Sequence, residues 1–313
     1  MSRCLSFTAS TDWVYRSFFA YAGLKSVSTD FGEGTLMHCW VPKIYKPSKP
    51  NLLLVHGFGA NAMWQYGDLL RQFIPRFNIY VPDLLFFGNS WTRRPERTEA
   101  FQAQCLKLLM DVHGVEKTNL VGISYGGFVG YSLAVQFPNA IDKLVLCCTG
   151  VCLEEKDMDE GLFKVSNIEE AANILVPQTP EKLKELMCFA FVRAPKAIPS
   201  CFLSDFINIM CTDYVEQKKE IIKSVLKDRQ LSKIPKVTQP TLIIWGEHDQ
   251  IFPVELGHRL KQHIGENARI EVIQQAGHAV NLEKPKEFAK HLKSFLIDSS
   301  SPAGPRHRRF WSF

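Results

Sequence analysis

Short apolar runs rich in β-branched residues alternate with stretches of helical periodicity, and this alternation restricts the fold more than any other feature. Four runs have the character of strands buried on both faces: Asn51–Val55, Asn78–Pro82, Thr118–Ile123 and Lys143–Cys148. Helical patterns separate them, at Ala62–Ile74, Thr98–His113 and Tyr125–Phe137. Successive strand–helix–strand units form right-handed crossovers, so the pattern predicts an α/β protein with a mostly parallel sheet.

The strand pattern continues at both ends of this region. Before it, Lys25–Phe31 and Thr35–Val41 flank a Gly-Glu-Gly turn, which predicts an antiparallel hairpin. After a long interval, two more strands alternate with two helical patterns, at Thr241–Trp245, Val254–Ile264, Ala268–Ile273 and Lys286–Ile297. The sequence therefore predicts eight strands in one mostly parallel sheet that is flanked by helices.

The long interval contains no convincing strand. Residues 151–236 show helical periodicity and helix starts, such as Thr179-Pro180 and a capping box from Ser166 to Glu169. We therefore expect one α/β core, residues 25–150 and 237–298, interrupted by a helical cap or lid at residues 151–236. Residues 1–24 are expected to form an N-terminal helical segment, and residues 299–313 a disordered tail.

The charge distribution argues against a nucleic-acid partner. The formal net charge of +5 includes Arg306, Arg308 and Arg309, which lie in a tail segment without any acidic residue. Without these three charges, residues 1–298 carry only +2, which is too close to balance for a nucleic-acid footprint. The basic tail with its Phe310-Trp311 pair favours at most a weak peripheral contact with an anionic membrane.

No apolar run reaches the roughly 18 to 20 residues that span a bilayer, so we expect neither a transmembrane helix nor a secretory signal. The short apolar stretch Trp13–Ala22 is interpreted as a helix packed on the core, with an interfacial helix that touches lipid as the alternative. The nine cysteines include no CxxC pair, which indicates reduced thiols and an intracellular protein, cytoplasmic or peripheral to a membrane. We expect no metal or other cofactor, and the oligomeric state stays open.

The segment Gly122–Gly126 reads G-x-S-x-G and follows a predicted strand directly before a predicted helix. This is the strand–turn–helix setting of a nucleophile elbow, in which a strained turn lifts a serine hydroxyl out of the sheet. Small neighbours at Gly122, Gly126 and Gly127 leave room for such a turn. Ser124 is therefore the candidate nucleophile.

A serine hydroxyl needs a base to accept its proton, and that base needs a carboxylate to orient it. His278 follows the last predicted strand and is the best placed histidine, whereas His56 is more easily interpreted as a residue that bonds the backbone of its own loop. Asp249 follows the strand Thr241–Trp245 and is the candidate carboxylate. Its rival Glu247 is more easily interpreted as a support for the loop.

The oxyanion of an acyl-transfer intermediate needs fixed N–H donors. One candidate is the backbone N–H of Tyr125, directly after the nucleophile. The other is the backbone N–H of Phe58, in the loop after the first buried strand, where flanking glycines allow close approach.

These motifs resemble those of the serine hydrolases of the α/β-hydrolase fold family. The resemblance rests on HGFG at residues 56–59, PDLLFFGNS at 82–90, GISYGG at 122–127, GEHD at 246–249 and AGH at 276–278. It covers residues 35–297 and is strongest toward esterases and monoacylglycerol-lipase-like members. It implies that Ser124, Asp249 and His278 form a catalytic triad, with Phe58 and Tyr125 as the oxyanion hole. Epoxide hydrolases and haloalkane dehalogenases are set aside because they place an aspartate at the position of Ser124.

The substrate pocket is expected between the sheet and the cap. Candidate lining residues, beyond Phe58 and Tyr125, are Phe86, Phe87, Met187, Phe189 and Phe202. An apolar wall favours an acyl or aryl group over a charged one, so the predicted substrate is a small-molecule carboxylic ester or lipid with an apolar acyl group, such as a monoacylglycerol. Two alternatives stay open: a carbon–carbon bond hydrolase of the ring-fission-product type, and a ligand-perceiving receptor built on the hydrolase fold.

Overall fold

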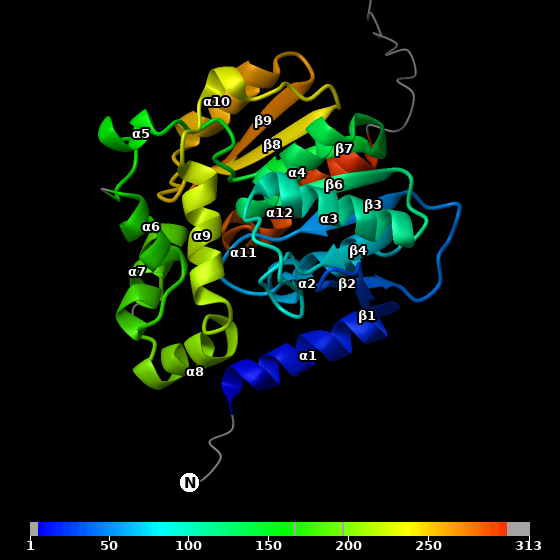
Figure 1. The fold of residues 1–313 in the computed structure, drawn as a ribbon, viewed down its shortest axis with the longest axis horizontal. Coiled ribbons are helices and arrows are strands. Elements are labelled where there is room, and N and C mark those ends of the chain that lie inside the picture. Colours follow the sequence, from blue (N-terminus) through cyan, green and yellow to red (C-terminus); the bar gives the residue numbers. More distant parts are fainter. Residues whose placement is uncertain (1–5, 166, 196, 299–313) are drawn as a thin grey trace, which may run out of the picture.

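A computed structural model describes residues 6–165, 167–195 and 197–298 of the chain. Nine strands form one sheet in the order β1-β2-β4-β3-β6-β7-β8-β9, with β5 paired to β2 off this path (Figure 1). The strands are β1 (Leu24–Asp30), β2 (Thr35–Pro42), β3 (Asn51–Val55), β4 (Asn78–Pro82), β5 (Trp91–Thr92), β6 (Thr118–Ile123), β7 (Ile141–Cys147), β8 (Thr241–Gly246) and β9 (Ala268–Ile273).

All eight predicted strands are present, and the prediction of a mostly parallel sheet is confirmed. The pairs that join β4, β3, β6, β7, β8 and β9 are parallel, whereas β1, β2 and β4 pair antiparallel. The strand count was one too low because β5 has only two residues, which pair with Thr35 and Leu36 of β2. Two residues are too short to show any periodicity in a sequence.

Helices of the core pack on this sheet: α2 (Ala62–Phe73), α3 (Glu99–Val112), α4 (Tyr125–Gln136), α10 (Val254–Ile264), α11 (Val280–Glu283) and α12 (Pro285–Leu296), with a short 3-10 turn, η1 (Pro138–Ala140). The helices α3 and α4 contact each other, and α4 contacts the central strands β6 and β7. The strands β6 and β8 are buried along their whole length, as continuous apolar runs predict.

Among the described residues between β7 and β8 lie five helices: α5 (Lys156–Asp159), α6 (Ile168–Leu175), α7 (Pro180–Ala190), α8 (Ser200–Met210) and α9 (Val215–Leu226), followed by the 3-10 turn η2 (Leu231–Lys233). They stand together at one side of the sheet (Figure 1). No strand occurs among the described residues of 151–236.

In α6 the N-cap is Asn167, whose side chain accepts from the Glu170 N–H, so the expected capping box is displaced by one residue. Its first member, Ser166, lies outside the described residues, as does the whole tail 299–313.

Two partly buried ion pairs join this helical segment to the core. Arg259 of α10 contacts the carboxylate of Asp157 with both of its terminal nitrogens, at 2.6 and 3.0 Å. Arg229 donates to Glu99 of α3 at 2.7 Å and to the Val151 carbonyl at 3.0 Å. Because the four charged side chains are largely shielded from water, these pairs fix the two ends of the segment more firmly than surface ion pairs would.

The N-terminal helix α1 (Phe7–Tyr21) packs against α2, α8 and β1, with Phe19 fully buried. Its backbone N–H at Thr8 donates to Asp205 of α8 at 2.8 Å. The opposite face carries three exposed apolar side chains: Trp13, Val14 and Tyr21. Within the part of the chain that is described, every helix is too short or too polar to cross a bilayer.

Candidate active site

Ser124 stands in a strained turn between β6 and α4. Its backbone has φ 54° and ψ −120°, a combination that residues with a side chain rarely adopt. The turn is tight because glycine hydrogens face backbone on both sides: a Cβ on Gly126 would lie 2.1 Å from the Val55 carbonyl oxygen, and one on Gly122 2.4 Å from the Gly126 carbonyl oxygen. The predicted elbow conformation is therefore present, and packing holds it.

The structure brings Ser124, His278 and Asp249 together although they lie far apart in the chain. His278 Nε2 is 2.9 Å from Ser124 Oγ, and His278 Nδ1 is 2.9 Å from Asp249 Oδ2. A carboxylate only accepts hydrogen bonds, so Nδ1 carries the proton and Nε2 accepts from the serine hydroxyl. The other oxygen of Asp249 accepts from the backbone N–H groups of Ile251 and Phe252, each at 2.9 Å, which fixes the carboxylate.

The two rival residues hold loops instead. Glu247 accepts from the backbone N–H of Gln275 at 3.0 Å and does not contact His278. His56 is fully buried: its Nε2 accepts from the Leu84 N–H at 2.9 Å, and its Nδ1 donates to the Gly57 carbonyl at 2.8 Å. Both residues therefore have the structural roles that were expected of them.

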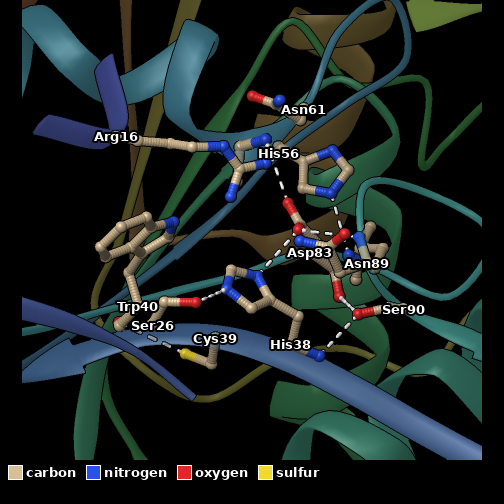
Figure 2. Close-up of polar contacts among 12 residues, drawn as sticks. Arg16, Ser26, His38, Cys39, Trp40, His56, Asn61, Asp83, Asn89 and Ser90 are labelled. Carbon is tan, nitrogen blue, oxygen red and sulfur yellow. Dashed lines mark hydrogen bonds and ion pairs between the residues drawn. The ribbon is translucent and has the colours of Figure 1, made fainter. Parts of the chain in front are cut away.

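A buried polar cluster lies behind the His56 loop (Figure 2). Asp83 accepts from His38 Nδ1 at 2.9 Å and from the Asn89 N–H at 3.3 Å, and its backbone carbonyl accepts from Ser90 Oγ at 2.7 Å. Burial raises the pKa of Asp83, but the hydrogen bond and charge of His38 outweigh this and hold the pKa below its usual range. Asp83 thus ties the loop at residues 86–90 to the sheet.

The loop that carries Phe58 is clamped by Gln65 of α2. The Gln65 side chain accepts from the Gly57 N–H at 2.9 Å and donates to the carbonyls of Gly57 at 3.0 Å and Phe58 at 3.2 Å. The Gly57 carbonyl is therefore held toward α2. In a trans peptide the carbonyl and the following N–H point in opposite directions, so the Phe58 N–H points away from α2.

The same loop lies directly against the nucleophile candidate. A Cβ on Gly57 would come within 2.7 Å of Ser124 Cβ, so only glycine fits there. The Tyr125 N–H belongs to the first turn of α4, where helix N–H groups have no intrahelical acceptor. The Phe58 loop and the start of α4 therefore lie side by side at Ser124.

Two apolar cavities meet at Ser124. A cavity of about 640 Å³ extends between the core, α1, α7 and α8, and it also contacts His278. A second one, of about 80 Å³, extends toward α6 and α9. Both are lined by Phe58, Leu175 and Ile251 next to Ser124, so these three side chains stand where the cavities join.

The expected pocket residues divide between these spaces. Met187 and Phe202 line the large cavity and Phe189 the small one. Phe86 lines neither, which corrects the expectation for it, whereas Phe87 lines a third cavity next to the Phe58 loop. Phe86 is 1% exposed and packs between Tyr214 and Arg97 in the contact between core and cap, and Phe87 lies behind Phe58 at a ring distance of 5.0 Å.

Glu283 of α11 is a further residue of the site that sequence reasoning missed. Its carboxylate accepts from the Gly277 N–H at 2.7 Å, directly before His278, and from the Val192 N–H at 3.0 Å, just after α7. The backbone of Ala279 also donates to Ala190 of α7 at 2.9 Å. The histidine loop is therefore bonded to the end of a cap helix. Neither Glu283 nor Gln65 belongs to a recognisable motif, so only the structure reveals them.

One group of residues near the triad has the spacing of metal ligands in the described part of the chain: Cys148, Asp249 and His278. Both ring nitrogens of His278 already face Ser124 and Asp249. Burial raises the pKa of the Cys148 thiol well above its usual value, which keeps it protonated, whereas metals bind the thiolate. The donor set therefore suits a proton relay better than a metal ion.

Comparison with known proteins agrees with this geometry. The family described as alpha/beta hydrolase fold matches residues 50–166 and 205–285, which together exceed half of the chain. This chain belongs to the α/β-hydrolase fold family. It is 27% identical over 273 residues to monoacylglycerol lipase ABHD6 of Bos taurus, a match that covers 81% of this chain and 77% of the relative.

Solved structures of similar fold extend the match to nearly the whole chain. A bacterial membrane phospholipase A superposes with a TM-score of 0.78 at 23% identity and covers 94% of this chain and 91% of its own. A putative lipase from Acinetobacter baumannii AYE superposes with a TM-score of 0.79 at 20% identity, covering 92% and 95%. At these identities the structures support the α/β-hydrolase fold rather than a particular substrate.

The burial of His56 predicts that stability falls at acidic pH. Burial lowers the pKa of His56, so below about pH 6.5 the unfolded chain binds a proton that the folded chain does not. The free energy of unfolding should then fall by up to about 1.4 kcal/mol per pH unit from this group. In urea unfolding at pH 7.5 and 5.5, His56→Gln should lose less stability between the two pH values than the wild type.

The matched control for this comparison is His258→Gln, which removes an exposed histidine of α10. It should lose as much stability between pH 7.5 and 5.5 as the wild type. If His56→Gln behaved like His258→Gln, His56 would not be the group that titrates on unfolding.

Proposed function

We propose that this protein is a serine hydrolase that cleaves carboxylic esters with a long apolar acyl chain. The observation that carries the proposal is the continuous contact from Asp249 through His278 to the strained Ser124, at the junction of two apolar cavities. The monoacylglycerol lipase relative supports the same class of reaction. A monoacylglycerol is accordingly the first substrate to test.

The proposed reaction is acyl transfer through a covalent intermediate. His278 accepts the Ser124 proton as Oγ attacks the ester carbonyl, and Asp249 stabilises the imidazolium that forms. The backbone N–H groups of Phe58 and Tyr125 bind the oxyanion of the tetrahedral intermediate. His278 then protonates the leaving alcohol, and water hydrolyses the acyl-enzyme by the same route.

The two cavities suggest how such an ester is oriented. The cavity of about 80 Å³ is the smaller of the two, so it suits the smaller part of the ester. The cavity of about 640 Å³ is lined mainly by apolar side chains of α7 and α8 and has room for a long chain. We therefore assign the acyl chain to the large cavity.

The catalytic roles are tested with the Ser124→Ala variant. A fluorophosphonate probe should label the wild type and not Ser124→Ala, and hydrolysis of 1-oleoylglycerol should fall by about ten-thousand-fold or more. A matched control is Ser132→Ala, which removes another serine of α4 outside the cavities. Labelling of Ser124→Ala at the wild-type rate would overturn the proposal.

The same assay separates the two alternative functions. A vinylogous diketone in the substrate panel tests carbon–carbon bond hydrolysis by the same three residues. Preference for that compound over every ester would assign the chain to that reaction. Binding of an ester with negligible turnover, together with a large ligand-induced shift in Tm, would favour a receptor.

The assignment of the acyl chain predicts an effect for one of two nearby residues of α7 and none for the other. Met187→Trp narrows the large cavity and should lower kcat/KM for a sixteen-carbon ester about tenfold relative to a four-carbon ester, because roughly two methylene groups lose their burial. Phe189→Trp narrows the small cavity and should leave this ratio unchanged. Assays of p-nitrophenyl ester series measure both ratios, and a reversal would place the acyl chain in the small cavity.

We also propose that the outer face of α1 makes a weak contact with lipid membranes. Trp13 is 68% exposed and Tyr21 92% exposed, on a helix that lines the large cavity through Phe7 and Thr8. In vesicle flotation, the double variant Trp13→Ser/Val14→Ser should bind phosphatidylserine vesicles several-fold less than the wild type. Leu108→Ser, which changes an exposed apolar residue of α3, should bind as the wild type does. Equal flotation of all three proteins would exclude this contact.

A further inference from the structure

A third cavity, of about 200 Å³, lies beside the loop that carries Phe58. It shares Phe58, Gly59, Ala60 and Leu175 with the large cavity, so the two spaces adjoin. Its remaining walls come from α1, from Asn61, from the loop at residues 87–89, from residues 176–177 after α6, from the end of α8 and from the start of α9. Unlike the two cavities at Ser124, it has polar and charged walls, and the mechanism proposed above does not use it.

Lys218 of α9 is the unusual residue of this cavity. It is only 6% exposed, yet its side chain makes no hydrogen bond or ion pair with any residue that the structure describes. Its ammonium group lies 5.2 Å from the centre of the Phe87 ring. A buried cation is normally paired with an anion, because its loss of hydration is otherwise uncompensated.

The acidic residues of the cavity compensate this charge only in part. Asp12 is fully engaged: one oxygen accepts from Arg16 at 2.8 Å, and the other accepts from Asn61 at 2.8 Å and from Trp64 at 3.1 Å. Asp213 is exposed and forms no ion pair with Lys218. Burial lowers the pKa of Lys218, which is the direction expected for an ammonium group whose counter-charge is incomplete.

Further donors face the same space. The guanidinium of Arg16 extends from α1 toward Asn61 and the cluster around His56 and Asp83 (Figure 2). Only its Nε is bonded to Asp12, so its two terminal nitrogens remain available. The backbone N–H groups of Gly59 and Ala60 donate no hydrogen bond to other described residues. Two cations and backbone N–H groups are the donors that proteins use for phosphate.

We propose that this cavity is an anion subsite that binds a phosphate group through Lys218, with Arg16 as the second cation. We assign the phosphate to the alcohol part of an acyl ester, and this assignment rests on the proposed function. Such a substrate would place its acyl chain in the large cavity, its ester at Ser124 and its phosphate across the Phe58–Ala60 loop. The subsite would then select phosphorylated acylglycerols over neutral ones of the same chain length.

The test has a binding part and a kinetic part. Inorganic phosphate should raise the Tm of the wild type and of Lys218→Arg but not that of Lys218→Met, because a ligand stabilises only the protein that binds it. In assays with 1-oleoylglycerol 3-phosphate and 1-oleoylglycerol, which differ only in the phosphate, Lys218→Met should lower kcat/KM for the phosphorylated ester at least tenfold. Its kcat/KM for the neutral ester should stay within twofold of the wild type. Lys219→Met, next to Lys218 on α9 and outside the cavity lining, serves as the control.

Each outcome decides one part of the proposal. A Lys218-dependent Tm shift without preference for the phosphorylated ester would support the subsite and assign it to a free anion. No shift in the wild type, or an equal loss of activity on both esters in Lys218→Met, would overturn the subsite. If neither ester is hydrolysed, the proposed function fails, while the Tm shift still decides the subsite independently.

Discussion

The packing of the turn at Ser124 against the ends of the central strands is the constraint on which the site depends. The turn keeps its positive φ because Gly126 touches the Val55 carbonyl and Gly57 touches the Ser124 side chain, with no space for a Cβ at either position. A strained conformation persists only where its surroundings leave no alternative. The parallel sheet supplies that rigidity, since β3, β6, β7 and β8 end at the same edge. Every other group of the site is placed relative to this edge.

The loops around Ser124 are joined to one another as well as to the sheet. Gln65 holds the Phe58 loop with its side chain, and its backbone carbonyl accepts from Asn281 of α11 at 3.0 Å. Glu283, also in α11, bonds both the loop of His278 and the residues after α7. The cap, the histidine loop and the Phe58 loop therefore meet at one short helix. A displacement of α7 would act on His278 directly, through hydrogen bonds rather than through the substrate alone.

Sequence reasoning located the elements best where a physical pattern was strong. The strands β3, β4, β6 and β9 have the predicted bounds, because continuous apolar runs leave little ambiguity about a buried strand. Sequence reasoning failed where an element was too short to show a pattern, or where two neighbouring residues suited the same role equally well. The strand β5 has two residues, and Ser166 and Asn167 are both good N-caps, so sequence alone could not choose between them. Phe86 fits a pocket by composition, but the loop tied by Asp83 directs it into the contact with the cap.

The sequence by itself determined the α/β alternation, the cap between β7 and β8, and the identity of the three polar residues at Ser124, Asp249 and His278. These follow from local periodicity and from residues placed directly after predicted strands, where parallel strands bring their ends to one edge. Only the tertiary structure decided the shape of the cavities, the clamps at Gln65 and Glu283, and the unpaired burial of Lys218. Those features depend on contacts between segments that lie far apart in the chain, and no local pattern encodes such contacts.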